Sequence, residues 1–119
     1  MQIPRQAALL RIYTEEGRRD GGRALYESVV LKARDAGLAG ATVLRGPMGF
    51  GVSAQLHTAT ILDLSANLPL VIEIVDAEDK LRAFADTLLG LRDIGLVTLE
   101  RVEVLHYGHA GEAPAAGAA

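Results

Sequence analysis

The same order of elements, a strand, an amphipathic helix and a second strand, is predicted twice along this chain. Each predicted helix ends in a related segment, Arg34-Asp-Ala-Gly-Leu38 in the first unit and Arg92-Asp-Ile-Gly-Leu96 in the second. Glycine at such a place is typical of the left-handed residue that ends a helix. Two strand–helix–strand units in one sheet, joined by right-handed crossovers, give the order β-α-β-β-α-β. The sequence therefore predicts an α+β, ferredoxin-like sandwich with both helices on one face of the sheet.

Hydrophobic periodicity locates the elements. Helices are expected near residues 23–36 and 77–92, and strands near residues 7–14, 41–45, 57–64, 70–75 and 97–105. The charged, glycine-containing segment 15–22 is predicted to be a loop. Asp76 is predicted to cap the second helix, because aspartate is a favoured N-cap residue.

The length of 119 residues fits a single domain, and half of the residues are apolar, which is a globular composition. We expect the folded domain to span residues 1–107. Residues 108–119 consist largely of alanine and glycine. They have nothing to bury, so a disordered tail is predicted there.

Two predicted strands are apolar on both faces, Leu70–Val75 and Val102–Leu105. Such a strand needs cover on both sides, yet the predicted helices occupy one face only. A bare sheet face would be a large exposed apolar patch. We therefore expect another copy of the chain to cover it.

Composition disfavours several classes of function. The net charge of −3 does not suit nucleic-acid binding, which requires a surplus of basic residues. The chain has no cysteine, so it can form neither a disulfide nor a thiolate metal site. No apolar run reaches about 18 residues, so no membrane insertion is expected. Residues 1–6 lack the apolar core of a signal peptide, and we expect a cytoplasmic protein.

The segment Gly40–Thr58 is the predicted functional loop. It begins like a strand and then places Gly46, Pro47, Gly49 and Gly51 within six positions. Glycine permits close backbone approach to a ligand, although a glycine-rich hairpin turn would look the same. The segment matches neither the P-loop nor the dinucleotide-binding fingerprint. Its backbone amides could still bind an anion.

Few side chains suggest catalytic or metal chemistry. Glu73 interrupts an aliphatic strand, so it either faces a ligand or a subunit interface, or forms an ion pair with an arginine. Arg45 is a candidate partner for Glu73 or for a phosphate. An acid–base site of Asp63, Glu73 and His57 can be drawn, but no nucleophile motif accompanies it. The histidines lack metal-ligand spacing, so we predict no catalytic residue and no metal site.

Ordered motifs along the chain resemble those of the PII signalling proteins and, more closely, an uncharacterised PII-like family, the domain of unknown function one-ninety. The likeness covers roughly Leu9 to Leu105. The motifs that carry it are Leu38-Ala-Gly-Ala-Thr-Val-Leu-Arg-Gly46, Met48-Gly-Phe-Gly51, His57-Thr-Ala, Leu68-Pro-Leu-Val-Ile-Glu-Ile-Val-Asp76 and Gly95-Leu-Val-Thr-Leu-Glu100.

The resemblance implies a non-enzymatic regulator that forms a homotrimer with its sheets packed inward. It also implies a cleft between subunits that binds an adenine nucleotide (ADP, AMP, ATP or cyclic AMP) as an effector, with no obligatory cofactor. The loop around residues 46–57 would present itself to a partner, often a transporter or a metabolic enzyme. The implied ligand-binding residues are Thr42, Arg45, Gly49, Phe50, Gly51, Glu73 and Val75. The implied partner loop contains Val52, Ser53, Ala54, Gln55 and His57.

The sequence departs from the PII pattern where PII proteins hold phosphate. Val52 replaces the basic residue after Gly-Phe-Gly, and Asp93-Ile-Gly-Leu96 replaces the glycine–lysine phosphate loop. The tail carries no counterpart of the arginines that bind phosphates. A monophosphate, diphosphate or cyclic nucleotide would need fewer basic groups than a triphosphate.

Two alternatives remain open at this point. The ferredoxin-like fold hosts unrelated chemistries, so a small enzyme that uses Glu73 or His57 is one of them. A trimeric metal-response or interaction module that resembles the CutA proteins, with His57 as a ligand, is the other.

Overall fold

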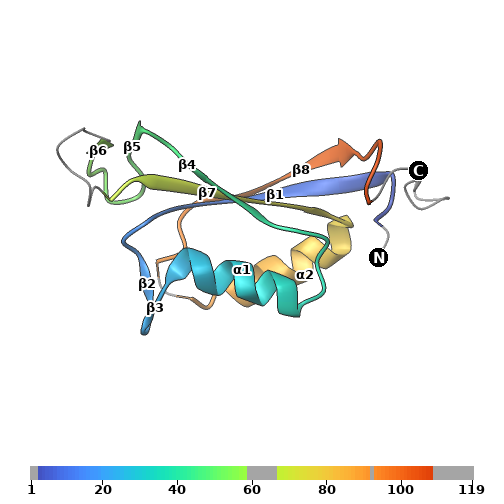
Figure 1. Cartoon of the computed structure of the whole chain (residues 1–119), viewed down its shortest axis with the longest axis horizontal. Coiled ribbons are helices and arrows are strands. Elements are labelled where there is room, and N and C mark those ends of the chain that lie inside the picture. The colour runs from blue at the N-terminus through green and yellow to red at the C-terminus, as the bar shows by residue number, and fades with distance from the viewer. Residues whose placement is uncertain (1–2, 59–66, 92, 109–119) are drawn as a thin grey trace.

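The computed structural model describes residues 3–58, 67–91 and 93–108, and within them it confirms the predicted mixed architecture (Figure 1). A four-stranded sheet has the order β4-β7-β1-β8, and every neighbouring pair is antiparallel. Both helices lie on the same face of this sheet (Figure 1). The elements are β1 (Gln6–Glu15), α1 (Leu25–Asp35), β4 (Thr42–Arg45), β7 (Pro69–Asp76), α2 (Glu78–Leu88) and β8 (Val97–Glu103).

Two short hairpin-like ribbons extend this plan. β2 (Arg19–Asp20) pairs with β3 (Arg23–Ala24), and β5 (Met48–Gly49) pairs with β6 (His57–Thr58). The first pairing corrects two predictions, since segment 15–22 is not wholly a loop and α1 begins at Leu25. Most of the strand predicted over residues 57–64, and the tail predicted from residue 108 except its first residue, lie outside the described residues.

The core fills the space between the sheet and the helices. Alternate residues of β1 and β7 point toward the helices, as expected from the two-residue period of a strand. They pack against an aliphatic stripe on each helix, which explains why a core with few aromatic residues is complete. The buried cluster includes Leu10, Ile12, Ile72, Ile74, Leu25, Val29, Leu81, Phe84 and Leu88.

The two related helix-end segments adopt different structures. Gly37 has φ +76°, its N–H donates to the Arg34 carbonyl, and the Leu38 N–H donates to the Ala33 carbonyl, which is a Schellman motif. The second helix already ends at Leu88, so the prediction that Gly95 ends it is wrong. Gly95 is instead required by close packing, because a Cβ there would lie 2.7 Å from the Tyr13 carbonyl oxygen.

Asp76 is not the N-cap of α2; its side chain links the start of that helix to the loop after α1. It is the last residue of β7, and the N-cap position of α2 is Ala77. The buried carboxylate accepts hydrogen bonds from the Ala77 N–H at 2.7 Å and the Ala39 N–H at 2.9 Å. Its side chain is thus directed toward the loop after α1, which the local sequence pattern did not indicate.

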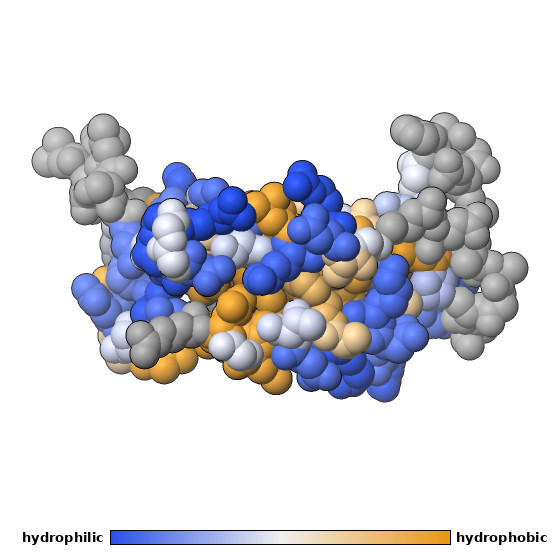
Figure 2. Space-filling model, turned by 90° about the horizontal axis from the view of Figure 1, so that it is seen from below, coloured by the Kyte–Doolittle hydropathy of each residue, from blue (hydrophilic) through white to orange (hydrophobic). Residues whose placement is uncertain are grey.

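The outer surface of the helix layer has hydrophobic side chains among hydrophilic ones (Figure 2). Between α1 and α2 this surface is hollowed into a shallow groove, whose lining includes Lys32, Leu38, Lys80 and Phe84. In the described part of the chain, neither helix has the length and apolar character needed to cross a membrane.

Candidate functional site

A cleft of about 390 Å³ lies at one end of the sheet, beside the β5–β6 ribbon. Segments far apart in the sequence meet there: the end of β1, the start of β7, the connection after α2, and the turn between β5 and β6. Its lining residues are Tyr13, Thr14, Glu15, Arg18, Phe50, Gly51, Val52, Ser53, His57, Pro69, Leu70, Val71, Asp93, Ile94, Gly95 and Leu96.

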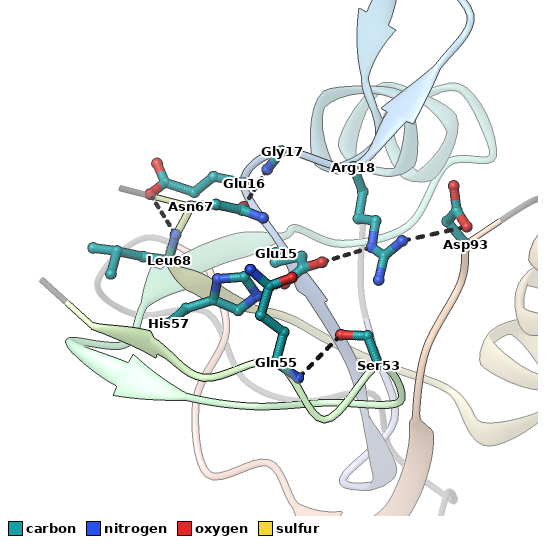
Figure 3. Close-up of polar contacts among 10 residues, drawn as sticks. All are labelled: Glu15, Glu16, Gly17, Arg18, Ser53, Gln55, His57, Asn67, Leu68 and Asp93. Carbon is teal, nitrogen blue, oxygen red and sulfur yellow. Dashed lines mark hydrogen bonds and ion pairs between the residues drawn. The ribbon is translucent and has the colours of Figure 1, made fainter. Parts of the chain in front are cut away.

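Four charged or titratable side chains form a connected series along this cleft (Figure 3). His57 Nε2 lies 2.5 Å from one oxygen of Glu15, and Arg18 Nε lies 2.8 Å from the other. Arg18 Nη1 is in turn 3.5 Å from Asp93. The series connects the β5–β6 ribbon to β1 and to the segment after α2, so it holds three sides of the cleft together.

A second set of contacts holds the neighbouring loops in place (Figure 3). The Gly17 N–H donates to Asn67 Oδ1 at 2.6 Å, and Glu16 accepts a hydrogen bond from the Leu68 N–H at 3.2 Å. The other oxygen of Glu16 is 2.7 Å from Arg45. Arg45 therefore neither pairs with Glu73 nor lines the cleft, which corrects its predicted pairing.

Thr14 carries a polar atom that the fold leaves without a partner. Its hydroxyl oxygen is buried and makes no hydrogen bond within the described residues. An unsatisfied hydroxyl of this kind is uncommon in folded proteins. Thr14 is among the residues that line the cleft, but this oxygen itself has almost no accessible surface.

The turn between β5 and β6 is exposed and carries no formal charge. Phe50 and Val52 are 72% and 89% exposed, although both line the cleft. Ala54 has φ +61°, and Ser53 Oγ accepts a long hydrogen bond of 3.4 Å from the Gln55 N–H. Both apolar side chains are therefore accessible on one short turn.

The predicted site residues divide into two groups. Phe50, Gly51, Val52, Ser53 and His57 line the cleft, with Gly49, Ala54 and Gln55 in or beside the same turn. A Cβ at Gly46 or Gly49 would lie 3.2 Å from the Pro69 ring, a tight contact that the ring would have to relieve by a small shift. The other group, Thr42, Glu73 and Val75, lies outside the cleft on the strands of the sheet.

Glu73 lies on the sheet face that the helices do not cover, which we term the open face. Arg11, its partner in the β1–β7 register, donates to Glu73 at 2.9 Å and also reaches Glu100 at 2.6 Å. The hydrogen bond to Glu73 is the main cause that raises the pKa of Arg11. Of the two interpretations of Glu73, the ion pair with an arginine is the one the structure contains.

Several cleft residues escaped sequence analysis: Thr14, Glu15, Arg18 and Asp93. Glu15, Arg18 and Asp93 are ordinary charged residues of predicted loops or strand ends. Asp93 has φ +68°, a conformation that aspartate tolerates better than most residues. Only the approach of β1 to the segment after α2 brings them together, so no local signal could have found them. In the described part of the chain, no three side chains of the metal-binding types come together.

The fold is similar to that of a solved protein. A solved structure described as a PII-like signaling protein from Thermus thermophilus matches with a TM-score of 0.63 at 17% identity, and the match covers 87% of this chain and 93% of that one. The chain belongs to the DUF190 family, described as "Uncharacterized ACR, COG1993", whose model matches residues 7–104.

Relatives from two organisms extend this assignment. A UPF0166 protein from Aquifex aeolicus (strain VF5) is 38% identical over 98 residues, which cover 82% of this chain and 92% of that protein. UPF0166 protein MJ1524 from Methanocaldococcus jannaschii is 37% identical over 76 residues, covering 64% of this chain and 69% of that protein. The predicted resemblance to this family is thus confirmed.

Proposed function

We propose that this protein is a cytoplasmic, PII-like regulatory protein without enzymatic activity. It forms a homotrimer, binds a small ligand, an adenine nucleotide, and regulates a partner protein through the loop around residues 46–57. The partner is a transporter or a metabolic enzyme.

One observation carries the proposal: the same turn that lines the cleft is also the exposed apolar tip. Phe50 and Val52 face both a possible ligand and the surroundings of the protein. A ligand that contacts Phe50 or displaces His57 from Glu15 would change the turn that a partner meets. A ligand can shift a conformation only if it contacts the two conformations differently. Here the turn between β5 and β6 would make both the ligand contacts and the partner contacts. The cleft volume lies in the usual range for small-molecule sites.

The open face supports self-association. Leu9, Val71 and Val75 are only partly buried there, and Leu44 is 49% exposed. Arg11 is held between two carboxylates in the centre of this apolar surface. In a trimer with inward-facing sheets, Thr42, Glu73 and Val75 would meet a neighbouring subunit, which is how they would come to contribute to an inter-subunit site.

Calorimetric titration of the purified protein with AMP, ADP, ATP and cyclic AMP tests the proposal directly. We expect at least one to bind, and we expect hydrogen exchange over residues 46–57 to slow or quicken on binding. Phe50→Ala should weaken binding, whereas Met48→Ala, on the same ribbon but outside the cleft lining, should not. If none of the four binds to the assembled protein, the nucleotide part of the proposal fails.

One observation favours an enzyme as the second candidate. His57 Nε2 and a carboxylate oxygen of Glu15 are neighbours in the cleft, and an imidazole beside a carboxylate is a candidate general base. Turnover of a substrate that His57→Ala abolishes, with the oligomer intact, would establish this alternative.

A further inference from the structure

We propose that the contact between His57 and Glu15 is a pH-sensitive switch. A protonated His57 holds the β5–β6 ribbon against the end of β1, and a neutral His57 releases it. The inference rests on the proposed function, in which this ribbon carries the loop that meets a partner, and it adds that pH regulates the position of that loop.

Two adjacent carboxylates at the end of β1 attach the two ends of the ribbon. Arg45, before the ribbon, lies 2.7 Å from Glu16, and His57, on β6, lies 2.5 Å from Glu15. Residues 46–56 between them contain no charged side chain. Arginine stays charged at any ordinary pH, whereas imidazole is the side chain that changes charge between about pH 5 and 8. Protons can therefore alter the attachment at His57 and leave the one at Arg45 unchanged.

The two ends of the ribbon also differ in their backbone attachment. At the first end, the Gly46 N–H donates to the Pro69 carbonyl at 2.9 Å. At the other end, residues 55–58 make no backbone hydrogen bond to the four-stranded sheet within the described part of the chain. Among the described residues, the contact of His57 with Glu15 is the polar link that attaches β6 to β1. A change in this contact should therefore move the His57 end of the ribbon more than the other end.

The geometry of the contact makes it depend on charge. The side chains of His57 and Glu15 are only 10% and 15% exposed, so salt screens their attraction less than it would at the surface. Nε2 is buried and makes no hydrogen bond with a described residue. Its distance from Glu15 suits a hydrogen bond, so it is the direction that does not. A neutral ring therefore gains little from the carboxylate, whereas a protonated ring gains the attraction between opposite charges.

The charges around His57 favour its protonated form. They come from β1 and the loop after it, from β4 and from the connection after α2, and the uncharged phenol of Tyr13 lines the same cleft. The charged side chains are Glu15, Glu16, Arg18, Arg45 and Asp93. Three carboxylates against two guanidinium groups leave one net negative charge. Burial disfavours a charged imidazole, but a negative neighbour favours it. Proton uptake should thus strengthen the attachment, and the attachment should weaken as pH rises.

A nitroxide label on the turn tests the switch in the protein without ligand or partner. The chain has no cysteine, so the exposed Gln55 can be changed to cysteine and labelled alone. Electron paramagnetic resonance spectra between about pH 5.5 and pH 8, the range in which imidazole changes charge, give the ratio of mobile to restricted label. At constant ionic strength, we expect this ratio to rise about 2- to 5-fold with pH, as for the loss of one ion pair.

Variants of the labelled protein assign the pH dependence to one contact. His57→Gln and, separately, Glu15→Gln should each give a high ratio of mobile label that no longer changes with pH. His106→Gln, the same change at an exposed histidine, is the matched control and should keep the full pH dependence. Glu16→Gln, which removes the partner of Arg45, should raise the ratio at every pH and keep its pH dependence.

Two results would overturn the switch. One is a ratio that stays constant or falls as pH rises, which is measured with His57 intact and so does not depend on how any variant folds. The other is a pH dependence that persists in both His57→Gln and Glu15→Gln. Neither result involves a nucleotide, so the switch can fail while nucleotide binding is found, and it can hold if calorimetry shows that no nucleotide binds.

Discussion

The two faces of β1 are built from alternate residues of one strand, yet they differ in kind. Leu10 and Ile12 point toward the helices and are almost fully buried. Leu9 and Arg11 point the other way and remain partly exposed, with Arg11 between Glu73 and Glu100. The helix-covered face is complete within one chain, whereas the open face combines apolar surface with an ion-pair series. The helix-covered face stabilises the subunit by itself, and the open face is the one that the proposed trimer would bury against a neighbouring copy.

The largest expected difference between the two faces is in the free energy of unfolding lost when a leucine on each face is replaced by alanine. Leu10→Ala should lower the free energy of unfolding by about 2–5 kcal/mol, because it leaves a cavity in the core. Leu9→Ala should cost about 1 kcal/mol in dilute solution, since less apolar area is lost. Urea denaturation at low protein concentration measures both. An equal loss at both positions would contradict the distinction for the isolated subunit.

A substitution at Gly95 tests the close approach between β1 and the segment after α2, beside the cleft. Gly95→Ala should destabilise the fold by about 1–3 kcal/mol, because its Cβ would lie 2.7 Å from the Tyr13 carbonyl oxygen. Gly90→Ala is the matched control, since a Cβ there meets no described atom within 4 Å. Thermal melts of the two variants compare them. A similar melting temperature for both would mean that the two backbones can separate at no cost.

Arg11→Met should affect assembly more than subunit stability. The isolated subunit should unfold almost as before, because partly exposed ion pairs contribute little. The open face, however, would then carry two carboxylates that have lost their shared arginine, and burying them against another copy is unfavourable. Sedimentation velocity should show smaller species for Arg11→Met than for the unsubstituted protein. Arg34→Met, on the exposed surface of α1, should not change the assembly.

The smallest expected effect is a change in melting temperature on substitution of Glu78, which lies on the helix-covered side of the molecule. Its hydrogen bond from Arg82, together with the nearby Arg101, lowers the pKa of Glu78. A carboxyl whose pKa is lower in the folded state stabilises the protein above its unfolded pKa of about 4.3, and this contribution disappears as pH falls through the folded pKa.

Glu78→Gln should therefore reduce the melting temperature slightly near pH 7 and not at all in strong acid. Melts between about pH 3 and pH 7, which span the unfolded pKa of the carboxyl, give the comparison. Asp86→Asn, on the exposed surface of α2, is the control. A difference between Glu78→Gln and the unsubstituted protein that stays constant over this range would contradict the assignment.

Local sequence signals were sufficient for the main elements and for one helix end. The alternation of β1 and β7 and the helical stripe of α1 depend on residues close together in the chain, which is why they could be predicted. Gly37 behaves as predicted because a Schellman motif involves only neighbouring residues. The same segment failed as a predictor at Gly95, where the requirement for glycine comes from Tyr13, far away in the sequence.

Only part of the candidate site could be predicted from the sequence. The turn at Phe50 and Gly51 was found because glycine spacing is a local signal. The series from His57 through Glu15 and Arg18 to Asp93 was not, because each contact depends on how separate segments approach one another. Glu73 was recognised as unusual by its apolar neighbours in sequence, but its partner depended on the β1–β7 register.

By itself, the sequence determined the ferredoxin-like order of elements, the aliphatic core and the glycine-rich turn, since these follow from periodicity and backbone preference over short spans. Tertiary structure alone decided that Arg11 and not Arg45 pairs with Glu73, and that Gly95 approaches Tyr13. It also decided that the turn lines a cleft together with Glu15, Arg18 and Asp93. These features depend on the register between strands and on the approach of distant segments, and neither is encoded in any one stretch of the chain.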